Sequence, residues 1–286
     1  MLSYRHAFHA GNHADVLKHF VLMQVLAYTA QKDKPFWYID THAGAGKYLL
    51  DTGYALQNAE FESGIARLLE DADLPAALAS FVAYVKSLNR ENQSSQYQLR
   101  HYPGSPIVAE ALLRPTDRMR LFELHPTDSK LLKQTFSHAG RQVLIATEDG
   151  FSGIKALLPP PPRRAVVLID PPYEDKTDYQ QVVASIKDSM ARFATGTYIV
   201  WYPLLQRPEP LQMVGKLKQL HPENWLNVSL TVQEPAMEGF GMHGSGLFIV
   251  NPPWTLPATL KEALPCLVGK LGQDAGAGFV LESQIS

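Results

Sequence analysis

The stretch Ala165-Val-Val-Leu-Ile169, followed at once by Asp170-Pro171-Pro172-Tyr173, guides the interpretation of the whole chain. A continuous apolar run of this length is typical of a strand that is buried on both faces. Such strands belong to parallel sheets that helices cover on both sides. Residue 170 marks the carboxyl end of the strand, and this is the edge of the sheet at which α/β proteins bind their ligands.

Six further apolar segments are predicted as strands, at 36–40, 119–124, 142–147, 197–202, 226–232 and 246–250. Helical patterns separate most of them. This alternation predicts an α/β protein with a doubly wound, mostly parallel sheet of seven strands. Only residues 233–245 join the last two strands, which favours an antiparallel hairpin at the edge of the sheet.

Residues 51–98 interrupt this alternation. They are rich in Ala, Leu and Glu, and their apolar residues recur at the spacing of amphipathic helices. We therefore expect a catalytic domain formed by 1–50 and 99–286, with a small helical insertion subdomain at 51–98. Substrate recognition and plain packing are both open as the role of the insertion.

Polar or glycine-containing turns follow four predicted strands: Asp40-Thr-His42-Ala-Gly44-Ala-Gly46, Glu123, Asp149-Gly150 and Asp170. Because parallel strands end at one edge of the sheet, these turns are expected to surround one ligand. The glycine turn that holds Gly44 lets a ligand approach the backbone closely. Glu123 can accept both hydroxyls of a ribose, and Asp149 can bind an adenine. A carboxylate at a helix start and an ordinary strand-to-helix turn remain alternatives for these two residues.

Other nucleotide sites fit the glycine turn less well. A dinucleotide site needs a third glycine where Leu49 stands, and a phosphate loop needs Gly at Thr41 and Ser or Thr at Tyr48. These requirements argue against a dehydrogenase and an ATPase. The order of the four turns instead predicts a Rossmann-like class I methyltransferase that depends on S-adenosylmethionine and releases S-adenosylhomocysteine.

Asp170, Pro171, Pro172 and Tyr173 are the predicted catalytic residues. The exocyclic amine of adenine is a weak nucleophile, because its lone pair is delocalised into the ring. Hydrogen bonds from the amine to the Asp170 carboxylate and the Pro171 carbonyl would favour a pyramidal nitrogen. Tyr173 would stack on a base that has been drawn out of its helix or loop. The expected reaction is therefore methylation of a nucleobase nitrogen.

Composition limits the other classes. The 286 residues include one cysteine, so a disulfide framework and a thiolate metal site are excluded. Neither a membrane-spanning stretch nor a leader peptide is apparent, and we expect a cytoplasmic protein. The formal net charge of -2 is unusual for a protein that binds nucleic acid. An enzyme, however, needs only a local basic surface.

Two other patterns are assigned structural roles. Asn251-Pro-Pro-Trp254 resembles the catalytic motif, but it follows the seventh predicted strand and not the fourth, so we expect a strand-ending turn. The N-terminal region contains His6, His9, His13 and His19 without a standard zinc spacing, and we expect no metal. From the residues alone, His19 is interpreted as a core histidine and Ser105 as a helix cap.

The chain resembles the RlmJ family of bacterial 23S ribosomal RNA adenine-N6 methyltransferases over essentially its whole length. The segments that carry this resemblance are Met1-Leu-Ser-Tyr4-Arg-His6, Gly11-Asn-His-Ala-Asp-Val-Leu-Lys18-His19, Asp40 to Gly46, Tyr102-Pro-Gly-Ser105-Pro, Glu123-Leu-His-Pro, Asp149-Gly150 and Asp170-Pro-Pro-Tyr173.

The resemblance implies that His19, His42, Ser105, Glu123, Asp149 and Gly150 bind the cofactor, and that Asp170 is catalytic. It also implies that Tyr4, His6 and Lys18 face the pocket and the RNA. The implied substrate is 23S ribosomal RNA, naked or partly assembled, and we expect a monomer. A DNA adenine-N6 methyltransferase and a non-catalytic module that binds S-adenosylmethionine or RNA remain the alternatives.

Overall fold

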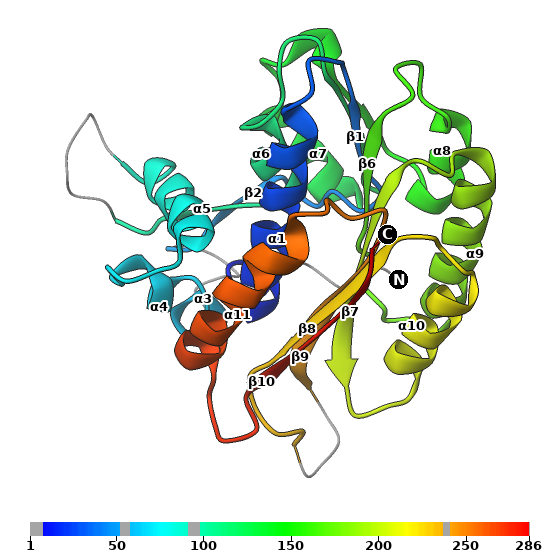
Figure 1. Ribbon diagram of the computed structural model, residues 1–286. Coiled ribbons are helices and arrows are strands. Elements are labelled where there is room, and N and C mark those ends of the chain that lie inside the picture. The colour runs from blue at the N-terminus through cyan, green and yellow to red at the C-terminus, as the bar shows by residue number, and fades with distance from the viewer. Residues whose placement is uncertain (1–7, 52–57, 91–97, 237–240, 286) are drawn as a thin grey trace.

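The protein, described by a computed structural model over residues 8–51, 58–90, 98–236 and 241–285, is built on a sheet in the order β10-β8-β9-β7-β6-β1-β4-β5 (Figure 1). The strands are β1 (Trp37–Asp40), β4 (Arg118–Phe122), β5 (Val143–Ala146), β6 (Ala165–Ile169), β7 (Thr197–Leu205), β8 (Trp225–Thr231), β9 (Met242–Val250) and β10 (Gly278–Gln284). Neighbours from β5 to β7 pair in parallel. The strand β9 is antiparallel to β7 and β8, and β10 is antiparallel to β8.

The Rossmann-like, mostly parallel α/β fold is confirmed, and each of the seven predicted strands overlaps an observed one. The expected number of seven is wrong, because β10 adds an eighth strand to the sheet. Its sequence, GFVLESQ, turns polar halfway, and most of its side chains are exposed. It therefore lacks the apolar pattern by which the other strands were found. The antiparallel pairing of the last two predicted strands is confirmed, but β10 forms that edge of the sheet.

Helices cover both faces of the sheet (Figure 1). One face carries α1 (His13–Ala30), α6 (Ser105–Glu110) and α11 (Leu256–Leu271), and the other carries α8 (Gly150–Leu157), α9 (Thr177–Arg192) and α10 (Glu209–Gln219). Helix α7 (Pro126–Thr135) packs beside β5, and a short 3-10 turn (Gly140–Gln142) precedes that strand. Among the described helices, none is both long and apolar enough to cross a bilayer.

The segment predicted as an insertion contains α3 (Glu60–Ser63), α4 (Ala66–Leu69) and α5 (Ala76–Ser87). A separate pair of antiparallel strands, β2 (Lys47–Leu49) and β3 (His101–Pro103), flanks it and brings its ends together. The Phe81 ring of α5 packs edge-on against Phe20 of α1, with 6.3 Å between centroids. These helices share the apolar core of the main domain. Their assignment to a separate subdomain stays a prediction.

Candidate active site

A cleft of about 480 Å³ opens at the carboxyl ends of β1, β4, β5 and β6. Twelve of the predicted site residues line it: Lys18, His19, His42, Gly44, Ser105, Glu123, Asp149, Gly150, Asp170, Pro171, Pro172 and Tyr173. The other two, Tyr4 and His6, lie outside the described residues. The sheet reverses its winding between β1 and β6, which is the position at which such folds form a ligand crevice.

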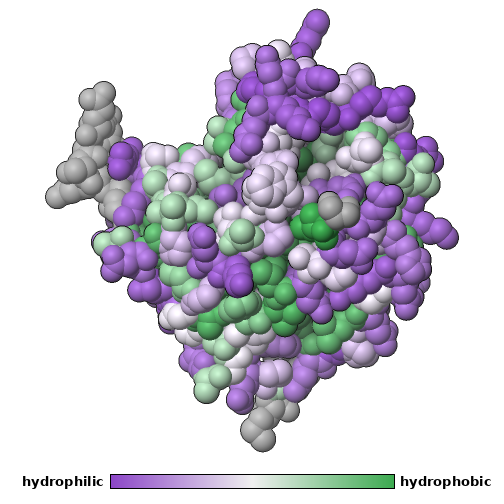
Figure 2. All heavy atoms as spheres, viewed as in Figure 1, coloured by the Kyte–Doolittle hydropathy of each residue, from purple (hydrophilic) through white to green (hydrophobic). Residues whose placement is uncertain are grey.

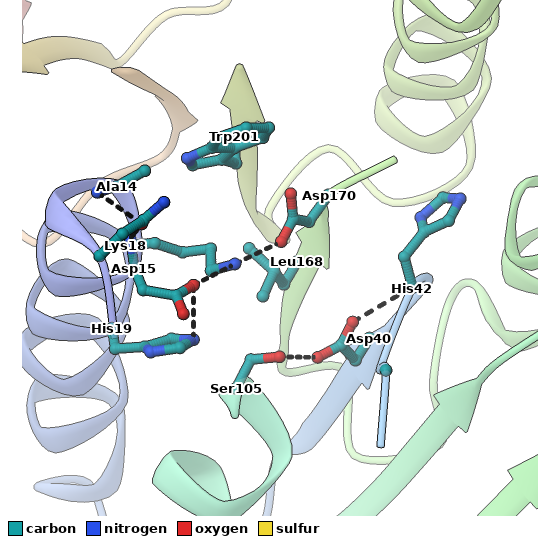
Figure 3. Close-up of polar contacts among 12 residues, drawn as sticks. Ala14, Asp15, Lys18, His19, Asp40, His42, Ser105, Leu168, Asp170 and Trp201 are labelled. Carbon is teal, nitrogen blue, oxygen red and sulfur yellow. Dashed lines mark hydrogen bonds and ion pairs between the residues drawn. The ribbon is translucent and has the colours of Figure 1, made fainter. Parts of the chain in front are cut away.

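Asp170 is held by a partly buried ion pair at the end of β6 (Figure 3). Its Oδ2 lies 2.7 Å from Nζ of Lys18, and the same Nζ lies 3.0 Å from Oδ1 of Asp15, one turn earlier on α1. The side chains of Asp15 and Lys18 are 1% and 5% exposed. Asp15 also accepts a hydrogen bond from the Gly11 amide. Two carboxylates thus compensate one buried ammonium, and they fix it beside the catalytic candidate.

The turn after β1 is organised by Asp40, a residue that sequence reasoning did not single out. Its fully buried carboxylate accepts hydrogen bonds from Ser105 Oγ at 2.6 Å, from the Tyr38 hydroxyl at 2.7 Å and from the His42 amide at 3.1 Å. Burial raises the pKa of Asp40 to about 6, and the hydrogen bonds oppose that shift. Burial also lowers the pKa of His42 to about 4, so this imidazole is neutral at pH 7.

Glu123 follows β4 and links the end of that strand to the turn after β1. Its Oε2 accepts a hydrogen bond from the Gly44 amide at 2.8 Å, and its Oε1 accepts one from the His125 amide at 2.7 Å. Burial raises the pKa of this carboxyl. His125, and not Glu123, caps α7. The carboxylate therefore fixes the glycine turn while it faces the cleft.

Asp149 and Gly150 form the start of α8. Asp149 caps the helix by accepting hydrogen bonds from the amides of Phe151 and Ser152. These contacts are those of an ordinary strand-to-helix turn, the alternative that the sequence left open for this residue. At Gly150, a Cβ atom would lie 2.1 Å from the Thr41 carbonyl oxygen. Only glycine allows α8 to approach the β1 turn this closely, because that distance is far below van der Waals contact.

Tyr173 lies in the wall of the cleft and is 2% exposed. Its hydroxyl donates to the Trp201 carbonyl at 2.6 Å, and its ring centroid is 4.5 Å from that of Tyr179. Its φ of 54° is left-handed, which is uncommon for a residue other than glycine. Trp201 also lines the cleft, and its ring centroid is 5.7 Å from Nζ of Lys18.

His19 agrees with its interpretation by sequence pattern alone, as a core histidine, whereas Ser105 differs from its own. His19 is buried, and its Nδ1 lies 3.2 Å from the Tyr102 hydroxyl, but it also borders the cleft. Ser105 is the first residue of α6, and Gly104 is its cap. The cap interpretation of Ser105 is therefore wrong, because its hydroxyl binds Asp40 instead.

The second Pro-Pro motif is remote from the cleft lining. Asn251 follows β9, and its side-chain amide donates to the carbonyl oxygens of Ala194 and Gly196. Trp254 is 70% exposed. Because β9 runs antiparallel to β7, this motif lies at the amino ends of the parallel strands. It forms the strand-ending turn that its position predicts.

The N-terminal histidines that the structure describes differ in their surroundings. Nδ1 of His9 lies 2.8 Å from Glu60 Oε1, whereas His13 is buried and its pKa is lowered to about 4 by that burial. Within the described part of the chain, no group of three His, Cys, Asp or Glu side chains could hold a metal ion. The expected absence of a metal stays a prediction, since His6 lies outside that part.

Known proteins resemble this chain over nearly its whole length. The sequence profile of the family described as "Ribosomal RNA large subunit methyltransferase D, RlmJ" matches residues 33–281. A protein of Escherichia coli K12 named ribosomal RNA large subunit methyltransferase J is 46% identical and covers 100% of this chain and 99% of its own length. Its namesake in Haemophilus influenzae is 44% identical over 99% of this chain and 98% of its own length.

Solved structures agree with this relationship. A Legionella pneumophila protein of 35% identity superposes with a TM-score of 0.86 and covers 96% of this chain and 98% of its own. A probable spermidine synthase from Corynebacterium glutamicum, 12% identical, shares only the fold, at a TM-score of 0.51 with 94% of this chain and 75% of its own covered. By profile, sequence identity and structure, the chain belongs to the RlmJ family of ribosomal RNA large subunit methyltransferases.

Proposed function

We propose that this protein transfers a methyl group from S-adenosylmethionine to the N6 amine of an adenine in 23S ribosomal RNA. The observation that carries the proposal is the position of Asp170-Pro-Pro-Tyr173, which lines one cleft together with the turns of β1, β4 and β5. Membership of the family supports ribosomal RNA as the substrate.

The cleft suits a cationic nucleoside. Its volume of about 480 Å³ is within the usual range for small-molecule sites. Among the described residues that line it, six are carboxylates (Asp15, Glu123, Asp128, Asp149, Asp170, Asp178), against the single ammonium of Lys18. S-adenosylmethionine carries a sulfonium and an ammonium group, and when bound it supplies the electrophilic methyl group.

We assign the cofactor contacts to the residues that follow the carboxyl ends of the strands and to their neighbours in the cleft. The Glu123 carboxylate binds the amides of Gly44 and His125, and its remaining lone pairs would accept the ribose hydroxyls. Asp149 and Gly150 would border the adenine. Gly44 and His42 of the β1 turn, with Ser105 and His19, would complete the pocket. The neutral His42 adds no positive charge to repel the sulfonium.

Asp170 and the Pro171 carbonyl would accept hydrogen bonds from the two amine protons of the adenine, which exposes the nitrogen lone pair. Lys18 holds Oδ2 of Asp170 and so fixes the direction of the carboxylate. Such fixed groups aimed at the reacting atom supply much of an enzyme's rate enhancement. The surplus proton of the nitrogen can leave to solvent after the transfer, so the role of Asp170 is that of a hydrogen-bond acceptor.

The aromatic residues would position the base. The small exposed part of Tyr173 and the neighbouring Trp201 form one wall of the cleft, and stacking on a base is worth roughly 1 to 3 kcal/mol. Tyr4, His6 and Lys18 are proposed to face the pocket and the RNA. We further propose that the enzyme acts as a monomer in the cytoplasm on naked or partly assembled RNA.

Transfer of labelled methyl groups by the purified protein tests the proposal. Protein-free 23S RNA should accept label as N6-methyladenine, while duplex DNA should accept none. Labelling of DNA in preference to RNA would support the DNA methyltransferase alternative. Retention of S-adenosylmethionine with no transfer to either substrate would support a non-catalytic module.

A further inference from the structure

We propose that a basic surface at the amino ends of the parallel strands binds phosphates of the same RNA, away from the methylated base. This surface, here named the basic rim, consists of Lys32, Lys34, Arg118, Arg120, Arg163 and Arg164. The inference rests on the proposed function, because it concerns how the RNA substrate is held.

Hydrogen bonds bring the loops of the rim together. Arg114 donates to the carbonyl oxygens of Lys32 and Lys34 at 2.8 Å each, and Arg164 donates to those of Thr29, at 2.6 Å, and Lys34. These contacts fix the loop between α1 and β1 against the starts of β4 and β6. Figure 2 shows hydrophilic residues concentrated over this loop, at the top of the view.

Charge at the rim is far from balanced. The segments that hold the rim and its neighbours Arg114 and Arg141 are residues 32–34, 114–120, 141 and 163–164, and they contain eight Lys and Arg against two Asp, a net charge of +6. The whole chain is at -2, so the remaining residues sum to -8. Asp117 is engaged by Arg114 at 2.9 Å, which leaves Asp33 as the other carboxylate within these segments. Such a concentration of cations is the electrostatic signature of a surface for phosphates.

The acidic cleft makes such a surface necessary. Six carboxylates and one Lys among its described lining residues favour a cationic cofactor, but they repel a polyanion. Affinity for RNA therefore has to come from elsewhere on the protein, since phosphate neutralisation dominates the binding of nucleic acids. The rim has the required sign of charge. The rim also contains a guanidinium held by an aromatic ring, because Cζ of Arg120 lies 4.2 Å from the Trp37 ring centroid. A planar guanidinium matches the geometry of a phosphate.

Helix α7 connects the rim with the cleft. It begins at the cleft, where His125 and Asp128 contribute to the lining, and it leads towards Arg141 and the rim. Its ten residues span about 15 Å. Lys130 and Lys133 are exposed along it. An RNA stem that lies over α7 would meet basic residues along its length while an adenine at its end enters the cleft.

The test compares two triple variants that remove the same charge. One is Lys32→Gln/Lys34→Gln/Arg163→Gln in the rim, whose side chains make none of the loop-fixing bonds above. The control is Lys187→Gln/Lys216→Gln/Lys261→Gln, exposed residues of α9, α10 and α11. Binding of a large 23S RNA fragment is measured against salt concentration, and methylation is measured on that fragment and on the shortest hairpin that is still methylated.

Three lost phosphate contacts should reduce the slope of log affinity against log salt by about 2 to 3 for the rim variant only. At low salt its affinity for the large fragment should fall at least about tenfold, while methylation of the hairpin and binding of S-adenosylmethionine stay unchanged. Equal salt slopes for the two variants would overturn the proposal. Absence of methylation by the wild type would refute the proposed function instead, and the salt slopes would still test the rim.

Discussion

The two ends of strands β1, β4 and β6 have opposite chemistry. At the carboxyl ends, a cleft lined by six carboxylates surrounds a single buried Lys, whereas the amino ends carry the basic rim. Both ends also carry a Pro-Pro-aromatic sequence. Asp170-Pro-Pro-Tyr173 follows a parallel strand into the cleft, and Asn251-Pro-Pro-Trp254 follows antiparallel β9 to the other end. Topology, and not the residue pattern alone, decides which of the two motifs can be catalytic.

The separation also has an electrostatic consequence. A cationic cofactor and a polyanionic substrate need surroundings of opposite charge, and the five residues of β6 keep the two regions about 17 Å apart. This distance exceeds the screening length of about 8 Å at physiological ionic strength, so solvent ions would largely screen the acidic cleft from phosphates at the proposed rim.

The largest effect is expected from Asp170→Asn. The amide keeps the shape but loses the charge that holds the amine, and loss of one such preorganised group costs about 10² to 10³ in rate. Methyl transfer to RNA should fall by that factor, with the affinity for S-adenosylmethionine within about threefold of wild type. Single-turnover transfer and calorimetry measure the two quantities.

Trp254→Ala is the matched change at the other end of the sheet. Trp254 is 70% exposed, so its removal should leave transfer unchanged and stability within about 0.5 kcal/mol. If this variant lost activity as Asp170→Asn does, the distinction between the two motifs would be wrong.

Gly150→Ala should have the next largest effect. The new Cβ would lie 2.1 Å from the Thr41 carbonyl oxygen, so α8 and the β1 turn must separate. We expect the free energy of unfolding to fall by about 1 to 3 kcal/mol and cofactor affinity to fall about tenfold. Thermal unfolding and calorimetry would show both changes.

The control is Gly215→Ala within α10, where a Cβ would meet nothing within 4 Å. This change should raise stability by about 0.5 to 1 kcal/mol, because alanine is the better helix former. Equal losses at both glycines would show that the contact with Thr41 is unimportant.

The smallest effect on cofactor affinity is expected from pH, through a group that also makes stability depend on pH. The folded pKa of Asp40, about 6, lies above its ordinary value of 3.8, so the folded state binds the proton more tightly. Stability from this group is therefore greatest at low pH and decreases as pH rises from about 4 to 6, by up to about 3 kcal/mol. The difference in unfolding free energy between wild type and Asp40→Asn, followed from pH 4 to 7, should change in that direction. A constant difference would contradict the assigned pKa.

Cofactor affinity should follow the same titration. Protonated Asp40 is a poorer acceptor for its bonds from Ser105 and the His42 amide, so affinity should weaken a few-fold below pH 6 and stay level above pH 7. Asp40→Asn should lack this dependence. Affinity that keeps rising between pH 7 and 9 would exclude Asp40 as its cause.

Much of the fold was predictable because the buried parallel strands are continuous apolar runs. Ala165–Ile169 is buried at all five positions, as its continuous apolar sequence predicts for a central strand. The strand β10 was missed because an exposed edge needs no such run. The convergence of Gly44, Glu123, Asp149 and Asp170 was predictable from strand order alone, since parallel strands end at one edge.

The rest of the site depends on long-range contacts. Asp15 and Lys18 have the spacing of an ordinary helical ion pair, and nothing local indicates that Lys18 reaches Asp170, 152 residues away. The roles of Asp40 and Ser105 likewise depend on a hydrogen bond between two separate turns. His19 was assigned to the cofactor only through the family resemblance, because its burial follows from how α1 packs.

Mass-spectrometric mapping of ribosomal RNA from a strain that lacks this gene decides whether the protein methylates 23S RNA through Asp170. We expect one N6-methyladenine of 23S RNA to be absent in that strain, to return with the wild-type gene and not to return with Asp170→Asn produced at the same level. A full set of N6-methyladenines in the deletion strain, or their restoration by the Asp170→Asn protein, would contradict this expectation.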